Sequence, residues 1–397
     1  WVVGEVRWDR QREIEAVIWL SQATGKSILK LDPEDYREHH LSALLARYGS
    51  SGPLNGEVFN ALIAKIRGRS KLPAGKKIIV FSPHPDDDVI SMGGILNKLH
   101  QNGNDIVVAY QTSGNIAVFD HEVRRYVDWL QRFSRDFEVG DGRVEELAAR
   151  IEGFLEGKRP GEVDIPEVQL VKRRIREAEA VSGIETFGMR REQACFLDLP
   201  FYQTGKVRKD PIGPEDVAIT LRLLEDERPE LVFVAGDLSD PHGTHRMCLQ
   251  AVELALREYS GEQPEMWYYR GAWQEWGVAD ADVLVPLSEE ELSLKIQAIF
   301  KHQSQKDRAP FPGQDEREFW QRVRERNTGT ALMVDALGLP EYFAMEAYVV
   351  RRDGKAPEPE PMSTSALARP PRYRRAGDHP GFLPSVREPA LPAGRSG

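Results

Sequence analysis

The 397-residue chain has little cysteine and no long apolar run, and both absences narrow what it can be. Its two cysteines, Cys195 and Cys248, form no Cys-x-x-Cys element, which argues against a disulfide scaffold and against a cysteine-rich zinc site. No apolar stretch approaches the roughly 20 residues that a membrane-spanning helix needs. A net charge of −10 argues against nucleic acid, because phosphate binding requires a basic surface. With 41% hydrophobic and 29% charged residues, the composition predicts a soluble cytoplasmic enzyme that binds neither nucleic acid nor a membrane.

An acidic turn after a predicted strand is the first candidate site. Residues 77–81 are apolar and branched, which predicts a buried strand, and Ser82-Pro83-His84-Pro85-Asp86-Asp87-Asp88 follows directly. Open α/β sheets bind ligands at the carboxyl ends of their strands, and the two prolines stiffen this turn. An imidazole with carboxylates suits zinc or a similar divalent metal. The alternative is a solvated acidic turn.

A second strand of the same kind, at residues 231–235, leads into a turn with two histidines. His242 and His245 are three residues apart, so both project from one face of the first turn of a predicted helix. Asp240 is a candidate N-cap with Pro241 at the first helical position. One histidine could be a core residue, but a pair at this position indicates further metal ligands.

Strands and helices alternate along the middle of the chain, which predicts a Rossmann-like α/β fold with a mostly parallel sheet and helices on both faces. Three regions are expected: a helical N-terminal segment at 1–74, the α/β domain at 75–353 and a disordered tail rich in proline and arginine at 354–397. The predicted strands lie near residues 77–81, 105–111, 194–197, 231–235, 266–270, 283–286 and 347–350. The predicted helices between the first strands lie near residues 89–102, 214–226 and 245–259.

A long charged insertion at residues 115–190 interrupts this alternation and is predicted to be helical. Insertions of this length beside an active-site edge are typical of lids or partner surfaces. A solvated pair of helices is the alternative.

The two histidine motifs resemble those of the PIG-L/LmbE family of zinc-dependent N-acetylglucosaminyl de-N-acetylases. That family has His-Pro-Asp-Asp-Glu after its first strand, here His84 to Asp88, and a later His-x-x-His, here His242 to His245. A late His-x-Ser-Gln is similar to His302-Gln303-Ser304-Gln305, and an Arg-x-x-Glu-type segment is assigned around Arg190-Arg191-Glu192. The resemblance spans about residues 75–350 and implies this family's fold and activity.

By this resemblance His84, Asp87 and His245 are zinc ligands, and Asp86 is the general base for the attacking water. His242 would stabilise the oxyanion or protonate the leaving amine. The sequence departs from the family at Asp88, which replaces a glutamate, and at Gly243-Thr244, where many relatives have Pro-Asp. Neither departure removes an expected ligand.

Other candidate substrate-binding residues have open alternatives. Ser113 and Asn115 follow the second strand and could bind sugar hydroxyls or only form a tight turn. Arg190 and Arg191 could bind a phosphate or another anionic group, or form surface ion pairs. His302 could line the pocket or cap a helix.

Residues 3–6, 16–21 and 110–120 resemble one bacterial subgroup, in which a glucosamine-6-phosphate deaminase/isomerase domain precedes the LmbE-type domain. The resemblance implies that the 1–74 segment is a remnant or linker after such a domain. The expected activity is zinc-dependent removal of an acetyl group from N-acetylglucosamine or a derivative, phosphorylated or not. The alternatives are a metal-dependent amidase for a non-sugar amide, a non-catalytic sugar-binding module, and a deaminase identity inherited from an absent N-terminal domain. The oligomeric state stays open.

Overall fold

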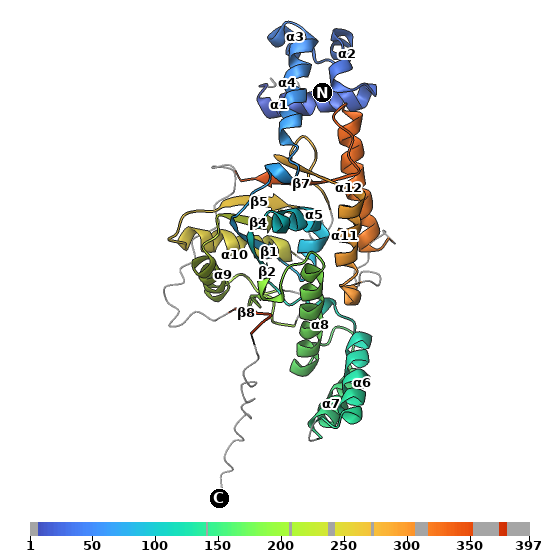
Figure 1. Cartoon of the computed structure of the whole chain (residues 1–397), viewed down its shortest axis with the longest axis vertical. Helices are drawn as coiled ribbons and strands as arrows, with labels where there is room; N and C mark the ends of the chain where they lie inside the picture. Colours follow the sequence, from blue (N-terminus) through green and yellow to red (C-terminus); the bar gives the residue numbers. More distant parts are fainter. Residues whose placement is uncertain are drawn as a thin grey trace, which may run out of the picture.

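The apolar segments predicted as strands form one sheet of eight strands in the computed structural model, which describes residues 7–139, 142–205, 209–236, 243–270, 274–305, 317–351 and 373–378 (Figure 1). The strands follow the order β6-β7-β5-β4-β1-β2-β3-β8. Their bounds are β1 Lys77–Ser82, β2 Asp105–Tyr110, β3 Ala194–Phe196, β4 Leu231–Ala235, β5 Glu265–Tyr269, β6 Val283–Leu287, β7 Ala344–Val350 and β8 Arg374–Arg375. The run from β3 to β5 is parallel, whereas β7 pairs antiparallel with β5 and β6, and β8 pairs antiparallel with β3. The predicted α/β class is confirmed.

Helices cover both faces of the sheet because successive strand residues point to opposite sides. In β1, Ile78 and Val80 pack with apolar residues of α5, α8 and α11, whereas Ile79 and Phe81 pack with those of α9 and α10. All four side chains are buried. The helices that form these layers are α5 Asp87–Gln101, α8 Pro166–Glu185, α9 Pro214–Glu227, α10 Thr244–Glu258 and α11 Glu289–Ile299.

The N-terminal segment is helical, as predicted, and shares a hydrophobic cluster with the far end of the sheet. Its helices pack against α12, Phe319–Ala336, and against β6 and β7 (Figure 1). Leu284 of β6 joins this cluster and accepts a backbone hydrogen bond from Arg67 at 2.8 Å. The N-terminal helices are α1 Arg10–Thr24, α2 Pro33–Glu38, α3 Ser42–Tyr48 and α4 Ser51–Lys65.

The insertion is helical as well, and its parts differ in position. Helix α8 packs on the central sheet, whereas α6, Asp120–Asp136, and α7, Arg143–Gly157, form a hairpin that projects from the opposite end of the molecule to α1–α4 (Figure 1). The hairpin has its own small core, which includes Val123, Val127 and Ile151. The predicted insertion therefore consists of two parts: α8 belongs to the α/β domain, and the α6–α7 hairpin extends from it.

Most of the predicted 354–397 tail lies outside the described residues. Residues 373–378 are described, and Arg374 and Arg375 form β8 on the edge strand β3. Arg374 also forms an ion pair with Glu177 of α8 at 2.6 Å. This short part of the tail is therefore attached to the domain.

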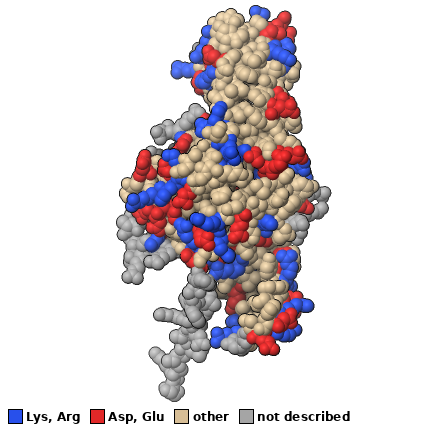
Figure 2. Space-filling model, in the orientation of Figure 1, with Lys and Arg blue, Asp and Glu red and all other residues tan. Residues whose placement is uncertain are grey.

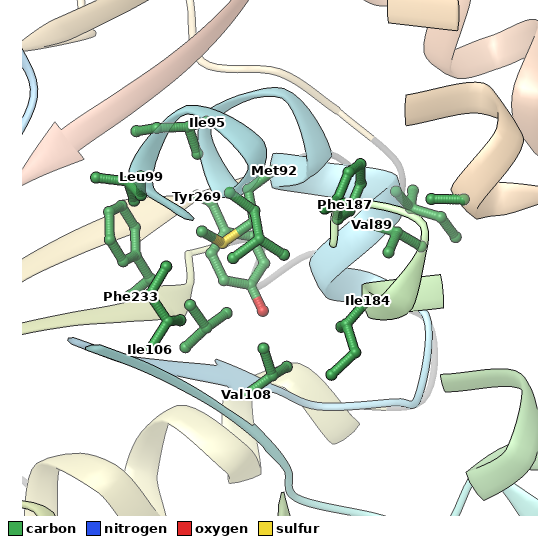
Figure 3. Packing of buried hydrophobic residues seen from close by; sticks show 14 of the residues in the cluster. Val89, Met92, Ile95, Leu99, Ile106, Val108, Ile184, Phe187, Phe233 and Tyr269 are labelled. Atoms are coloured by element: carbon green, nitrogen blue, oxygen red, sulfur yellow. The ribbon is translucent and has the colours of Figure 1, made fainter. Parts of the chain in front are cut away.

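Helix α5, which starts at the acidic turn, has a break near its middle. Met92 has φ −136° and ψ 21°, so the helical hydrogen bonding is interrupted there. The backbone N–H groups of Gly94 and Ile95 donate instead to the buried carboxylate of Glu346 on β7, at 2.8 and 2.7 Å. Lys295 lies 2.7 Å from that carboxylate, and neither side chain is exposed to solvent. The helix half that follows the break is thus capped by a buried ion pair. Ile95 and Leu99 of this half belong to the apolar cluster shown in Figure 3.

Gly94 is expected to tolerate no side chain, because a Cβ there would lie 2.5 Å from Leu287 and 2.9 Å from Glu346. We expect Gly94→Ala to lower the free energy of unfolding by about 1–3 kcal/mol, as overpacking does. Urea unfolding followed by circular dichroism measures this. Gly153→Ala in α7 is the control, since its Cβ would have no neighbour within 4 Å. The control should gain up to about 1 kcal/mol, and an equal response of both variants would contradict this packing.

Candidate active site

The turn after β1 is held by its own hydrogen bonds. The backbone N–H of His84 donates to the Asp87 carboxylate at 2.9 Å, and the N–H of Asp86 donates to the His84 carbonyl at 2.8 Å. Helix α5 begins at Asp87, so the rigid turn and the first helical turn present His84, Asp86 and Asp87 together. The local sequence, with Pro83 and Pro85 in the turn, favours this fixed conformation.

His245 approaches this turn from α10, the helix that follows β4. Because β1 and β4 are parallel neighbours, their carboxyl ends meet at one edge of the sheet. Asp87 Oδ2 lies 3.1 Å from His84 Nδ1 and 3.3 Å from His245 Nε2. Among the described residues, these three form the group of histidines and carboxylates that could hold a metal ion, with all donor atoms within 4.8 Å of one another.

The three donors fit a zinc ion in number and chemistry, and two of their distances agree with such a site. Bonds of roughly 2.0–2.1 Å in a tetrahedral site place neighbouring ligand atoms about 3.3 Å apart, which matches the two distances above. The side chains of Asp87 and His245 are 4% and 3% exposed, whereas that of His84 is 27% exposed and leaves an approach from solvent. Burial favours the neutral form of Asp87, but His245 and His84 outweigh it and hold the pKa of this carboxyl well below its usual range. A carboxylate and two imidazoles with one accessible side are typical of a catalytic site.

Asp86 points to a different partner from that of its neighbour. Its Oδ2 lies 3.1 Å from Nη2 of Arg176 on α8, and both side chains are almost fully buried. Asp86 also borders a small cavity of about 20 Å³, whose lining includes His302, Gln305, Phe319 and Trp320. The two adjacent aspartates therefore face separate groups, one the histidine pair and the other a cavity.

Arg176 and Glu179 were missed as site residues by the sequence interpretation. They have the Arg-x-x-Glu spacing of the segment that the resemblance placed around Arg190–Glu192. Glu179 accepts hydrogen bonds from the backbone and hydroxyl of Ser304, at 2.6 and 2.7 Å, so this helix meets the His-x-Ser-Gln segment. The sequence did contain a sign of this pair, because residues three apart lie on one face of a helix. The segment was interpreted only as part of the charged insertion.

Arg190 and Arg191 do not reach the site. Both are exposed and precede β3, so they lie at the amino end of a parallel strand, whereas His84 follows the carboxyl end of β1. Their predicted role in substrate binding is corrected for this reason. A residue close to a strand in sequence can lie at either end of it, and only the carboxyl end faces the site.

His302 lies at the site, immediately before a short 3₁₀ turn at Gln303–Gln305. Only 4% of it is exposed, and neither ring nitrogen has a hydrogen-bond partner among the described residues. Burial lowers the pKa of His302 to about 4, so the imidazole is neutral at neutral pH. A neutral, unpaired imidazole facing the cavity beside Asp86 is available to a ligand.

Ser113 and Asn115 follow β2 at the same sheet edge. Ser113 Oγ lies 3.4 Å from the Gln203 side chain, and Asn115 Oδ1 is buried without a hydrogen-bond partner among the described residues. Between them, Gly114 has a φ of 61°, and a Cβ there would come within 2.9 Å of Arg176 Nε. Glycine is thus required for the close approach of Arg176 to this turn.

Two further residues complete the surroundings of His84. Asp88 accepts a hydrogen bond from Tyr110 at 3.1 Å and is fully buried, so it supports the turn from below. The ring of Tyr202 meets that of His84 edge-on with centroids 6.1 Å apart, a contact that the sequence did not indicate. His242 lies outside the described residues, as do Asp240 and Pro241.

At the carboxyl ends of its parallel strands, the sheet carries three residues that could hold a metal ion and a separate carboxylate, that of Asp86. The chain is therefore an α/β protein with a candidate catalytic metal site. Residues 79–256 match the family described as PIG-L: GlcNAc-PI de-N-acetylase, so this part of the chain is similar to that family. The recognition of this family from the histidine motifs is confirmed.

The proteins similar to the chain include two curated relatives and a solved deacetylase structure. A glucosamine-6-phosphate deaminase-like protein of Bacteroides thetaiotaomicron is 44% identical over 371 residues, covering 88% of this chain and 56% of its own length. Diacetylchitobiose deacetylase of Thermococcus kodakarensis is 28% identical over 130 residues, covering 28% of this chain and 49% of its own length. The solved N,N'-diacetylchitobiose deacetylase of Pyrococcus horikoshii is 16% identical with a TM-score of 0.39, covering 70% of this chain and 84% of that one. The chain thus spans about half the length of the curated relatives that it matches.

Among the described helices, none combines the length and apolar composition needed to cross a lipid bilayer.

Proposed function

We propose that this chain is a zinc-dependent hydrolase that removes the acetyl group from an N-acetylated amino sugar. The observation that carries the proposal is the meeting of His84, Asp87 and His245, with Asp86 beside them and facing a cavity. The PIG-L family supports it, as does the relative named diacetylchitobiose deacetylase. N-acetylglucosamine or a derivative, with or without a phosphate, is the proposed substrate. The cytoplasmic location stays a prediction from composition.

His84, Asp87 and His245 would hold the zinc ion, which when bound supplies Lewis acidity for the acetamide carbonyl and the attacking water. Asp86 would accept a proton from that water at a carboxylate oxygen as the water oxygen attacks the carbonyl carbon. Arg176 fixes the orientation of this carboxylate through its contact at 3.1 Å. The two adjacent aspartates thereby have separate roles, because their side chains have separate partners.

The carbon–nitrogen bond then breaks, which gives acetate and a free amine that must take up a proton. His242 is proposed to donate this proton or to stabilise the oxyanion, a role that rests on the family motif alone. His302 and Asn115 are proposed to contact the substrate, because each has a buried polar atom without a partner among the described residues. Ser113 is proposed to contribute a hydroxyl from the same turn.

Arg176→Gln should weaken both the fold and turnover. The substitution leaves the buried Asp86 carboxylate without its cationic partner, a change that typically costs about 3–5 kcal/mol of stability. We expect turnover to fall about tenfold or more even at temperatures where the variant is fully folded, because Asp86 loses its fixed orientation. Urea unfolding and steady-state kinetics measure the two effects.

Arg124→Gln is the matched control, since it removes an arginine from an ion pair with Glu152 on the hairpin surface. Its loss should cost about 1 kcal/mol or less and leave turnover unchanged. If Arg176→Gln matched the control in both measurements, Arg176 would have no part in positioning Asp86.

The substrate is tested by measuring acetate release from the zinc-loaded chain. The panel contains N-acetylglucosamine, its 6-phosphate, diacetylchitobiose and a non-sugar N-acetylated amine. Acetate from an amino sugar supports the proposal, whereas acetate only from the non-sugar amine would replace it with a general amidase. The name of the 44% identical relative favours one further assay, ammonia release from glucosamine 6-phosphate. Ammonia release without deacetylation would overturn the proposed reaction.

A further inference from the structure

One face of helix α6 carries a row of exposed aromatic and aliphatic side chains. Tyr126, Trp129, Leu130, Phe133 and Phe137 recur at helical spacing, and each is between 36% and 66% exposed. They are five of the fourteen large hydrophobic residues that are exposed in the described part of the chain. Isolated exposed apolar residues are ordinary, but a continuous row of this kind marks an interaction surface.

The row is distinct from the face of α6 that the chain already uses. Val123 and Val127 on the neighbouring face pack against α7 in the small core of the hairpin. On the exposed face the rings contact each other, with centroids 5.2 Å apart for Trp129 and Phe133 and 4.6 Å apart for Phe133 and Phe137. Rings that contact each other in this way form one continuous apolar ridge. They do not present the separate exposed ring faces on which sugar rings stack.

The charges on α6 favour a protein partner over a membrane. Four acidic and four arginine residues lie between Asp120 and Asp136, so the helix carries no net charge apart from His121. Binding to anionic lipid requires a basic excess on the polar face. Figure 2 shows charged residues of both signs around tan surface at this end of the molecule. A partner with a similar mixture of charges and an apolar ridge fits this surface.

We infer that this face pairs with the same face of a second copy of the chain, with the two α6 helices antiparallel. A two-fold axis beside residue 131 would place Trp129 opposite Phe133 of the second copy and Tyr126 opposite its Phe137. The same axis brings Arg125 opposite Asp136 of the second copy. Arg125 and Asp136 are about three helical turns apart, so they lie on the same side of the apolar row. When two antiparallel helices are related by a two-fold axis, this side of one helix faces the same side of the other. The apolar row is thus self-complementary. Arg125, which already pairs with Glu122 of its own helix, would gain Asp136 of the second copy. Arg132 on the same side stays paired with Asp128 of its own helix.

The contact is small, so the dimer is expected to be weak. Helix α6 has 17 residues and is therefore about 25 Å long. Interfaces of one helix pair fall at the low end of specific interfaces, and we expect dissociation in the micromolar range. The projecting position of the hairpin lets two copies meet without obstruction by the central sheet (Figure 1).

The test is sedimentation velocity of the full chain over a range of about 1–200 µM, combined with a charge-exchange series. Wild type should shift from monomer to dimer, and Trp129→Glu should weaken dimerisation at least tenfold. Arg125→Asp and Asp136→Arg should each weaken it, whereas the double variant should restore it. Leu332→Glu on α12 is the control, because this leucine is 68% exposed on a helix away from the hairpin, and it should have no effect.

Three results would overturn the inference. The first is a wild type that stays monomeric at every concentration. The second is a dimer that is unaffected by Trp129→Glu or not restored in the double variant. The third is binding of the monomer to anionic phospholipid vesicles that Trp129→Glu abolishes, which would assign the ridge to a membrane. Circular dichroism of each variant checks that the helices are intact, as expected for substitutions at exposed positions.

Discussion

Asp86→Asn should reduce turnover by about two to four orders of magnitude, the contribution expected of a general base. The substitution keeps the size of the side chain and its ability to accept a hydrogen bond from Arg176, but removes its capacity to take up a proton. Zinc content should stay at that of wild type, because Asp86 faces Arg176 and the cavity while Asp87 faces the two histidines. Steady-state kinetics with elemental analysis of the same preparation checks both statements.

The stability of this variant has to be measured beside its activity. Removing the Asp86 charge leaves Arg176 buried with Glu179, whose carboxylate is 3.9 Å away, as its remaining acidic neighbour. A loss of stability is therefore expected, and kinetics belong at a temperature where the variant is folded. Asp35→Asn is the control for the same exchange at a buried aspartate, since Asp35 pairs with Lys26 among the N-terminal helices. Wild-type turnover in Asp86→Asn would exclude Asp86 as the base.

The sequence predicted the central sheet and the histidine motifs because each has a strong local signal. A run of branched apolar residues bounded by a polar turn identifies a buried strand, and parallel neighbours bring their carboxyl ends together. These rules predicted that the acidic turn and the turn with two histidines would meet, and the family resemblance implied His84, Asp87 and His245 as the residues that do so. The observed distances of 3.1 and 3.3 Å agree with that expectation.

The residues that the sequence did not identify depend on long-range packing. Arg176 lies about 90 positions from Asp86 on a helix of a charged insertion, and its sequence resembles that of many solvated helices. Only the packing of α8 on the sheet buries it. The same holds for Glu346, whose carboxylate caps the second half of α5 from a strand near the end of the chain. The sequence of β7 shows a glutamate at position 346, but it does not show that this side chain is buried and pairs with α5.

Arg190 and Arg191 illustrate the opposite error. Two adjacent arginines near a predicted strand suggested an anion site, but the strand direction puts them at the edge away from His84. Arg176 and Glu179 have the Arg-x-x-Glu spacing, but so do Arg174 and Glu177 on the same helix. Only the fold shows that Arg176 is the one that reaches Asp86.

His245→Ala should remove the metal and with it nearly all activity. Removal of a residue that only hydrogen-bonds to a metal ligand typically lowers metal affinity by roughly 10–100-fold. Removal of one of three direct ligands should lower it further. After loading with zinc and desalting, wild type should retain about one zinc per chain and the variant little or none. Zinc should also raise the melting temperature of wild type, because a ligand that binds the folded state stabilises it, and this rise should be absent in the variant.

His100→Ala provides the matched histidine control. His100 lies in the last turn of α5, 12 residues and about three helical turns beyond Asp88, so its loss should change neither zinc content nor the zinc-dependent rise in melting temperature. The pair of variants separates two failures. If His245→Ala kept one zinc per chain with unchanged affinity, the ligand set would be wrong. If it lost the zinc but wild type released no acetate from any amide, the metal site would stand and the proposed reaction would fall, because metal binding needs only the three donors while hydrolysis also needs Asp86.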